Sequence, residues 1–261
     1  MQLSELVRRL DDRLDTDAYA DVDASANGLQ VGPNGVTVRS TDPDVDRVAF
    51  AVDAAVETID AAADAGADVL VTHHGISWGG IDHVTGRTYD RIAALVEADL
   101  SLYVSHLPLD GHGELGNAAG VADELGLTDR APFGELGPVT IGTVGELPDS
   151  TPVDRLRDRL DEFEGSATDT RLLPFGPDGV ERVAVVTGSG VDWLDEAVEA
   201  GTDALVTGEG KQQVYHDARE AGISVLLAGH YATETFGVRS LQSLAEEWGL
   251  ETTYVSHPTG L

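Results

Sequence analysis

The sequence predicts an α/β fold of two similar α/β lobes related by an internal repeat, and three observations lead to that prediction. Apolar segments typical of buried strands alternate with amphipathic helical segments along most of the chain, as in parallel α/β layering. Residues 60–75 and 195–210 match at 9 of 16 positions without a gap. A second similar pair follows in the same order, SHLPLD at 105–110 and GHYATE at 229–234. An internal repeat accounts for both pairs.

The expected elements follow the chain in order. An amphipathic helix covers residues 1–14. The first lobe then has strands at 46–52, 68–73 and 101–105 and helices at 53–65, 89–99 and 114–126. The C-terminal part has strands at 182–187, 203–207, 224–228 and 252–256 and helices at 191–200, 211–221 and 234–248.

Three segments make up the expected domain organisation. The first α/β lobe is expected at residues 1–128 and the second at 182–261. Between them, residues 129–181 contain a strand-like run at 139–147, a helix opened by Pro152 and a second strand at 170–175. Because this segment has no Gly/Ser-rich linker, we expect a small bridging β-α-β element within one compact molecule.

The composition excludes several classes of protein. No apolar stretch approaches the ~18 residues of a membrane span, and the N-terminus lacks the apolar block of a signal peptide, so a cytoplasmic protein is expected. The absence of cysteine excludes disulfides, a thiolate nucleophile and sulfur-ligated metal. A formal net charge of −31 repels nucleic acids and anionic lipids, so neither is an expected partner.

The 47 acidic residues, against 16 Lys and Arg, are scattered through the whole chain, which favours adaptation to a salt-rich cytoplasm over an acidic binding patch. We expect a higher Tm in molar KCl than in dilute buffer, because the Debye length falls to ~3 Å at 1 M and self-repulsion is screened. Thermal unfolding followed by circular dichroism across a KCl series measures this. A Tm that does not change with salt would contradict the interpretation.

The repeat also predicts where chemistry takes place. In open parallel sheets, ligands bind beyond the carboxyl ends of the strands. If the lobes are related, four strand ends are equivalent, and each is followed by a histidine or a carboxylate. The residues at these ends are His73, His74, His106 and Asp110 in the first lobe and Glu209, His230 and Glu234 in the second.

Imidazole and carboxylate groups bind borderline divalent metals, and this set suits two ions with a carboxylate between them. His73 and His74 are expected to serve different ions, because successive side chains on a strand point to opposite sides. His230 and Glu234 can face one point if a helix begins there. Local roles are the alternatives: a surface histidine pair, a buried hydrogen-bonded His230, a Glu234 at a helix N-terminus and an Asp110 that caps a turn.

Weaker candidates lie elsewhere. The TGSG turn at 187–190 is an anion cradle or a simple turn, and the NGLQVG segment at 27–32 lines a pocket or leads into a strand. The other four histidines lack equivalents in the repeat, so surface or local roles are expected for His83, His112, His216 and His257.

The segments THHGISWGG, SLYVSHLPLDGHGELGNAAG, VTGSG and AGHYATETFG, in this order and spacing, resemble the dinuclear-metal proteins called GTP cyclohydrolase 1 type 2, or the NGG-one-interacting factor three family. The resemblance covers nearly the full chain. It implies two lobes facing each other across two divalent ions, in toroidal homohexamers with the sites facing an inner cavity. The insertion of many bacterial members is missing, since 129–181 is too short. The implied metal ligands are His73, His74, Asp110, His230 and Glu234.

Two functions are compatible with this resemblance. The first is a dinuclear metal-dependent hydrolase that opens the purine ring of GTP at C8 with loss of formate, or hydrolyses a related nucleotide. His106 and Glu209 are then the candidate catalytic residues for proton transfer, and a hydrogen bond from His106 to a ligand is the alternative. The second is a non-catalytic metal carrier or regulatory scaffold. Zinc, iron and manganese all suit the ligand types.

Overall fold

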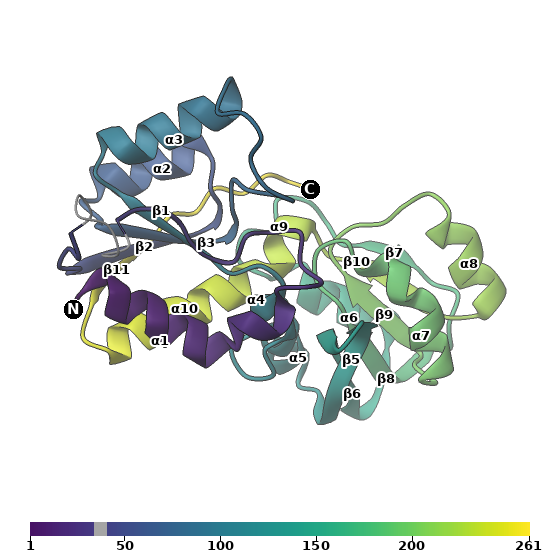
Figure 1. Cartoon of the computed structure of the whole chain (residues 1–261). Coiled ribbons are helices and arrows are strands. Elements are labelled where there is room, and N and C mark those ends of the chain that lie inside the picture. The colour runs from purple at the N-terminus through teal and green to yellow at the C-terminus, as the bar shows by residue number, and fades with distance from the viewer. Residues whose placement is uncertain (34–40) are drawn as a thin grey trace. The chain divides into compact units, whose positions relative to one another are not determined.

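The computed structural model describes residues 1–33 and 41–261, which form two compact units. The first unit comprises Met1–Leu109 and Val238–His257, and the second comprises Asp110–Gly237 and Pro258–Leu261. Each unit contains a β-sheet with helices packed on it (Figure 1).

The sheet of the first unit has the strand order β1-β4-β3-β2-β11. β2, β3, β4 and β11 run parallel, and the edge strand β1 is antiparallel to β4. The strands are β1 (Gly28–Val31), β2 (Arg47–Asp53), β3 (Val69–His74), β4 (Ser101–Val104) and β11 (Glu251–Tyr254).

Helices cover both faces of this sheet (Figure 1). On one face, the apolar side chains of Ile59 and Leu95 pack with Leu70 and Leu102 of the sheet in one buried cluster. On the other, the N-terminal helix buries leucines three or four residues apart, which form a single apolar stripe. The helices are α2 (Val56–Asp64) and α3 (Arg87–Glu97) on the first face, and α1 (Leu3–Leu14) and α10 (Thr235–Glu247) on the second; a 3-10 helix η1 (Thr16–Tyr19) follows α1.

The sheet of the second unit has the strand order β5-β6-β8-β9-β10-β7. Its centre, β8-β9-β10, is parallel, and the outer strands pair antiparallel. The strands are β5 (Thr128–Leu136), β6 (Val139–Pro152), β7 (Arg171–Leu173), β8 (Gly179–Val185), β9 (Ala204–Thr207) and β10 (Ser224–Leu227).

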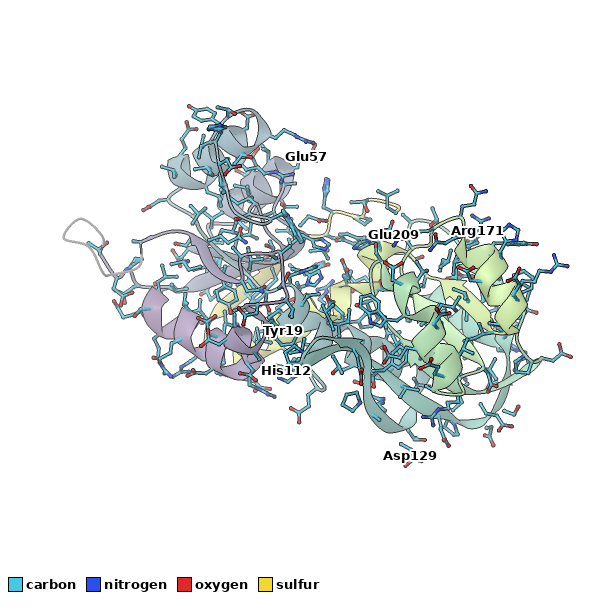
Figure 2. The ribbon with its side chains drawn as sticks, turned by 45° about the vertical axis from the view of Figure 1, so that its right-hand side comes forward. Tyr19, Glu57, His112, Asp129, Arg171 and Glu209 are labelled. Carbon is cyan, nitrogen blue, oxygen red and sulfur yellow. The ribbon has the colours of Figure 1, made fainter. Side chains whose placement is uncertain are left out.

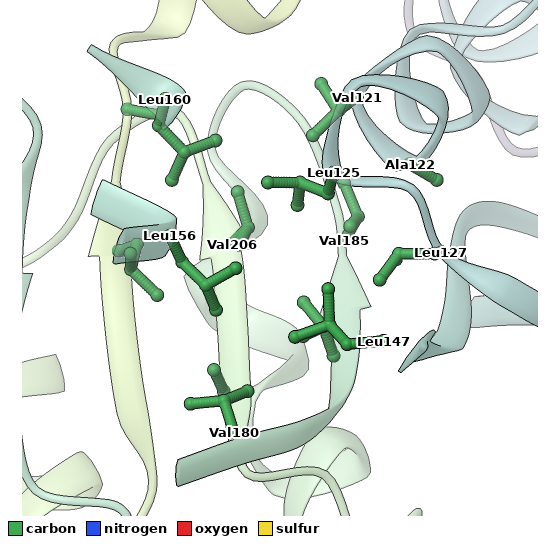
Figure 3. Close-up of a cluster of buried hydrophobic side chains, with 14 of the residues drawn as sticks. Val121, Ala122, Leu125, Leu127, Leu147, Leu156, Leu160, Val180, Val185 and Val206 are labelled. Carbon is green, nitrogen blue, oxygen red and sulfur yellow. The ribbon is translucent and has the colours of Figure 1, made fainter. Parts of the chain in front are cut away.

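Apolar side chains of two helices fill one face of this second sheet. Figure 3 shows Leu125 of α5 (Asn117–Leu125) and Leu156 and Leu160 of α6 (Val153–Leu160) against Val185 and Val206 of the strands. α7 (Leu194–Glu199) and α8 (Val214–Ala221) lie on the other face (Figure 1). Short helices α4 (Leu107–Gly111), η2 (Gly190–Trp193) and α9 (His230–Thr233) follow strand ends.

Both units contain the same set of hydrogen bonds from an aspartate and an arginine to the backbone. The carboxylate of Asp68 accepts the amide N–H of Arg47 at 2.9 Å, and the carboxylate of Asp203 accepts that of Arg182 at 3.0 Å. Each arginine also donates to a backbone carbonyl in the turn before the neighbouring strand, at 2.7 and 3.1 Å. These bonds join corresponding strands, β2 with β3 and β8 with β9, at positions that match in the sequence.

The expected elements are present, but the chain divides differently from the expected lobes at 1–128 and 182–261. Residues 110–128 and the segment 129–181 belong to the second unit, and residues 238–257 belong to the first. The segment expected to bridge the lobes is instead part of the second sheet, because its strands β6 and β7 pair with β8 and β10. The sheet also contains β5, which pairs with β6. Likewise β11 completes the first sheet by pairing with β2. Such pairings between distant segments leave no local pattern in the sequence.

No helix within residues 1–33 and 41–261 combines the length and the apolar character needed to cross a bilayer.

Candidate metal centre

The predicted site residues other than Asp110 end a parallel strand or follow one within a few residues. In the first unit, His73 and His74 end β3 and His106 follows β4. The second unit holds the others: Asp110 lies in α4, Glu209 follows β9, His230 opens α9 and Glu234 follows it. Figure 2 labels Glu209.

His73 and His74 are oriented by hydrogen bonds to their Nδ1 atoms. The Nδ1 of His73 contacts the backbone carbonyl of Ser105 at 3.0 Å, and that of His74 contacts the Asp53 carboxylate at 2.9 Å. The ring centroids are 4.6 Å apart, although both residues belong to β3. Because Nδ1 is engaged in each ring, Nε2 is the nitrogen presented as a ligand.

His106 is held in the same way by a buried carboxylate. Its Nδ1 contacts Asp23 Oδ1 at 2.9 Å, and the Asp23 side chain is only 1% exposed. Asp23 also accepts hydrogen bonds from the amide N–H groups of Ser25 and Leu107 and from Asn27 Nδ2. Burial raises the pKa of the Asp23 carboxyl, but its hydrogen bonds and the charge of His106 outweigh burial and lower it. An ionised Asp23 therefore fixes the His106 ring.

Three imidazoles gather in the first unit. One donor atom each of His73, His74 and His106 lies within 4.8 Å of the others. The indole of Trp78, which is 47% exposed, meets the His106 ring edge-on at 4.9 Å between centroids. Nitrogen ligands at this spacing can hold a borderline divalent ion.

The NGLQVG segment braces this cluster. Asn27 Oδ1 accepts the amide N–H of His106 at 2.7 Å, and Gln30 Oε1 accepts that of Ile76 at 2.9 Å. A Cβ at Gly75 would overlap the Gln30 amide, so a larger residue after the histidine pair would have to displace this side chain and its hydrogen bond to Ile76. Of the two interpretations of the segment, a turn leading into a strand is the one that describes β1. The side-chain amides of Asn27 and Gln30 hold the loops that carry His106 and Ile76.

In the second unit, His230 lies between two carboxylates. Its Nε2 is 3.0 Å from Glu234 Oε1 and its Nδ1 is 3.1 Å from Glu209 Oε1. The short helix α9 brings His230 and Glu234 together, as the spacing of four predicts. Ser189 donates a hydrogen bond to Glu209, which lowers the pKa of that carboxyl. Glu209 thus positions the His230 ring.

Asp110 is buried and is hydrogen-bonded to two side chains of the second unit. Its Oδ1 accepts hydrogen bonds from Asn117 Nδ2 at 2.9 Å and Thr187 Oγ1 at 3.1 Å. The turn after it is held by His112, whose Nδ1 accepts two amide N–H groups. Two neutral donors therefore hold the buried Asp110 carboxylate in place.

The TGSG turn makes room for the His230–Glu234 pair. Gly188 has a φ of +59°, and a Cβ there would overlap the Glu234 carboxylate and lie 3.1 Å from His230 Nε2. Its carbonyl accepts the amide N–H groups of Gly208 and Glu209 at 2.9 Å. The turn therefore leaves space for the Glu234 carboxylate and holds the backbone at Glu209. These contacts differ from the anion-binding turn considered from the sequence.

Gly188→Ala is expected to displace Glu234 and to lower metal affinity by at least ~10-fold, a change comparable to the loss of a ligand's hydrogen-bond partner. Gly201→Ala is the matched control, since Gly201 also has a positive φ, +69°, with nothing within 4 Å of its Cβ position. Both variants lose stability from the strained backbone, about 1 kcal/mol. Metal titration calorimetry checks the difference; equal affinities would refute the proposed crowding.

The donor set fits divalent metal ions better than any organic cofactor. The Nδ1 atoms of His73, His74 and His106 are each engaged by an orienting partner, which is the usual arrangement of a metal-binding histidine. His230 has a carboxylate at each ring nitrogen. Two buried carboxylates, Asp110 and Glu234, lie beside donors or an imidazole. Carboxylate oxygens and imidazole nitrogens are both ligands of borderline divalent ions.

Metal binding is expected to release a proton from His230. Burial alone lowers the pKa of His230, but Glu234 and Glu209 raise it to about 9, so the metal-free ring is protonated at neutral pH. A metal ligand must be the neutral ring, so near pH 7.5 about one proton per chain leaves. Calorimetry in two buffers with different ionisation enthalpies measures the number of protons released, and identical heats would contradict the prediction.

Because the pKa of His230 in the folded, metal-free protein lies above its usual value of 6.5, this form should also lose stability as the pH rises from about 6.5 to about 9.

Several residues that orient the site were not predicted. Asp53 ends β2 beside β3, and its position at the carboxyl end of an expected strand was a usable signal. Asp23 lies 83 residues from His106 in a loop, where the sequence carries no such signal. Asn117 carries no such signal either. Gly188 was noted only as part of the TGSG turn, without its position beside Glu234.

The chain matches the profile of Duf34/NIF3 (NGG1p interacting factor 3) over residues 1–259. The chain belongs to the Duf34/NIF3 family. A GTP cyclohydrolase 1 type 2 homolog of Halobacterium salinarum is 56% identical over 262 residues, with 100% of both chains covered. One from Archaeoglobus fulgidus is 42% identical, again over 100% of both. These relatives confirm the resemblance drawn from the sequence motifs.

Solved structures support the same assignment. TTHA1606 from Thermus thermophilus superposes with a TM-score of 0.87 at 37% identity, and 100% of each chain is covered. The mixed α/β fold with two sheets is thus the fold of Duf34/NIF3 proteins.

Proposed function

We propose that this Duf34/NIF3 protein is a dinuclear metal-dependent hydrolase of the GTP cyclohydrolase type, acting on the purine ring of GTP or on a related nucleotide. The two divalent ions, zinc, iron or manganese, would be held by His73, His74, Asp110, His230 and Glu234. The observation that carries the proposal is that both units present oriented imidazoles or buried carboxylates at carboxyl strand ends. Matching sequence positions and matching backbone bonds support a common origin of the two sets.

When bound, the ions would polarise the substrate and make water more acidic. The chain itself contributes proton transfer and orientation. His106 is the best placed residue for proton transfer, because ionised Asp23 holds its Nδ1 and leaves Nε2 to exchange a proton with substrate. Glu209, whose pKa is lowered by Ser189, remains an ionised partner of His230.

The proposal is tested by release of formate from GTP. Protein loaded with zinc, iron or manganese is incubated with GTP in molar KCl, and formate is measured enzymatically. We expect formate from the wild type and a loss of at least ~100-fold in His106→Ala with both metals retained. The control His257→Ala removes an exposed histidine that pairs with Glu57, and should not affect turnover. No turnover with any nucleotide under all three metals would favour a non-catalytic metal carrier or scaffold.

Assembly as a homohexamer is also proposed, on the strength of the family resemblance. The segment after β3 exposes large apolar side chains, among them Ile81, Val84 and Tyr89, and exposed apolar groups of this size are common at protein interfaces. Analytical ultracentrifugation should give the mass of six 27.4 kDa chains. A monomer in molar salt would overturn this part of the proposal.

A further inference from the structure

A cavity of about 540 Å³ lies within the second unit, outside the residues proposed to bind metal. Its lining includes Arg171, Lys211, Tyr215, His216 and Leu227. The volume is in the range of small-molecule sites, which run from roughly 300 to 1,000 Å³. The apolar and aromatic part of the lining provides a surface for contact, and Arg171 and Lys211 provide positive charge.

The cavity lies at the same edge of the sheet as Glu209 and His230. Leu227, the last residue of β10, pairs with Thr207 at the end of β9 and with Arg171 at the start of the antiparallel β7. Glu209 follows Thr207 by two residues and His230 follows Leu227 by three. Figure 2 labels Arg171 and Glu209 in this unit. A ligand in the cavity would therefore lie beside the proposed catalytic edge.

The charge of this cavity is opposite to that of the rest of the chain. Acidic residues outnumber Lys and Arg by 47 to 16, and Lys211 is the only lysine. Within the described residues, the lining contains Arg171, Lys211 and His216 and no carboxylate. A neutral or cationic ligand gives no reason for this local reversal, whereas an anion does.

Two further features favour an anion. Val214 and Tyr215 of the first turn of α8, with Gln212 just before the helix, form part of the lining, and the N-terminus of a helix attracts negative charge. Lys211 Nζ contacts both carboxylate oxygens of Asp192 at 2.5 and 2.6 Å, and both groups are about half exposed. This exposed pair is weak enough for a phosphate to compete for the ammonium group.

We propose that this cavity binds the phosphate groups of a nucleoside phosphate, the substrate of the neighbouring site. Arg171 provides a planar guanidinium for two oxygens of one phosphate, and Lys211 provides a point charge for the next. Tyr215 provides an aromatic surface beside them. The inference rests on the proposed function for the identity of the substrate, and on the cavity alone for its anionic chemistry.

Calorimetric titration of the metal-loaded protein with GTP, inorganic triphosphate and guanosine tests this, at the lowest KCl concentration that keeps the fold intact by circular dichroism. We expect GTP and triphosphate to bind and to compete with each other, and guanosine to bind at least ~10-fold more weakly. Arg171→Gln and Lys211→Gln should each weaken GTP binding by roughly 10-fold or more, without affecting guanosine. Asp192→Asn, which frees Lys211, should strengthen it.

Arg155→Gln is the matched control, because it removes an exposed arginine of α6 in the same unit, outside the cavity. Wild-type affinity for GTP in both Arg171→Gln and Lys211→Gln would overturn the proposal, as would binding of triphosphate without GTP. The proposed hydrolase has a separate outcome. GTP bound through Arg171, with no turnover of GTP or any other nucleotide under all three metals, would refute the hydrolase and leave the cavity assignment standing. Formate release with an unchanged KM in Arg171→Gln would support the hydrolase and overturn the cavity assignment.

Discussion

His74→Ala in the first unit and Glu234→Gln in the second are each expected to lower metal affinity by more than ~100-fold, because the loss of a ligand exceeds the ~10–100-fold cost of losing a ligand's hydrogen-bond partner. His74 is preferred to His73, which is fully buried and would leave a cavity in the core. Glutamine keeps the volume of the buried Glu234 side chain and removes only its charge. Elemental analysis after dialysis measures the metal content per chain.

The control for this pair is Glu199→Gln, which removes a carboxylate at the exposed end of α7 and should keep both ions. Circular dichroism verifies the fold of each variant. If only one of the two variants lost metal, the residue changed in the other would not be a ligand, and the proposed ligand set would be wrong. Loss in both variants is the outcome that the proposed ligand set requires.

Asp23→Asn is expected to lower the turnover of the proposed reaction by roughly 10²–10⁴-fold while both metals remain bound. Asp23 Oδ1 accepts from His106 Nδ1 and from the Ser25 amide, and Oδ2 accepts from Leu107 and Asn27. An asparagine replaces one of these oxygens by an NH₂ group that cannot accept. His106 then loses its fixed orientation or changes tautomer, so its Nε2 no longer exchanges the proton.

Asp23→Asn also weakens the fold, by about 1–3 kcal/mol, because a buried carboxylate loses hydrogen bonds. Turnover is therefore measured well below the Tm of the variant, together with its metal content and the pH profile of kcat/KM. Asp21→Asn, at an exposed position two residues away, is the control and should leave all three unchanged. If Asp23→Asn reduced activity only in proportion to unfolded protein, its role would be structural and His106 would not depend on it.

Local patterns predicted the elements of this fold better than their assembly. Strand runs such as residues 46–52 and 68–73 correspond to β2 and β3, because a buried parallel strand needs a continuous apolar run. The antiparallel β5, which is largely exposed, lacks such a run and was not predicted. The short antiparallel β1 was only one of two interpretations of residues 27–32. The expectation of a largely parallel sheet is correct for the first unit and only for the centre of the second.

The sequence alone determined the kinds of side chain at the strand ends, histidines and carboxylates, because their chemistry and their place after an apolar run are both local properties. It also determined the family. Only the tertiary structure decided which groups orient them: Asp53 for His74, Asp23 for His106 and Glu209 for His230. It also decided which sheet each edge strand joins. The physical reason is that hydrogen-bond partners and strand neighbours are selected by closeness in space after folding, and residues 83 positions apart in the chain carry no mark of that closeness.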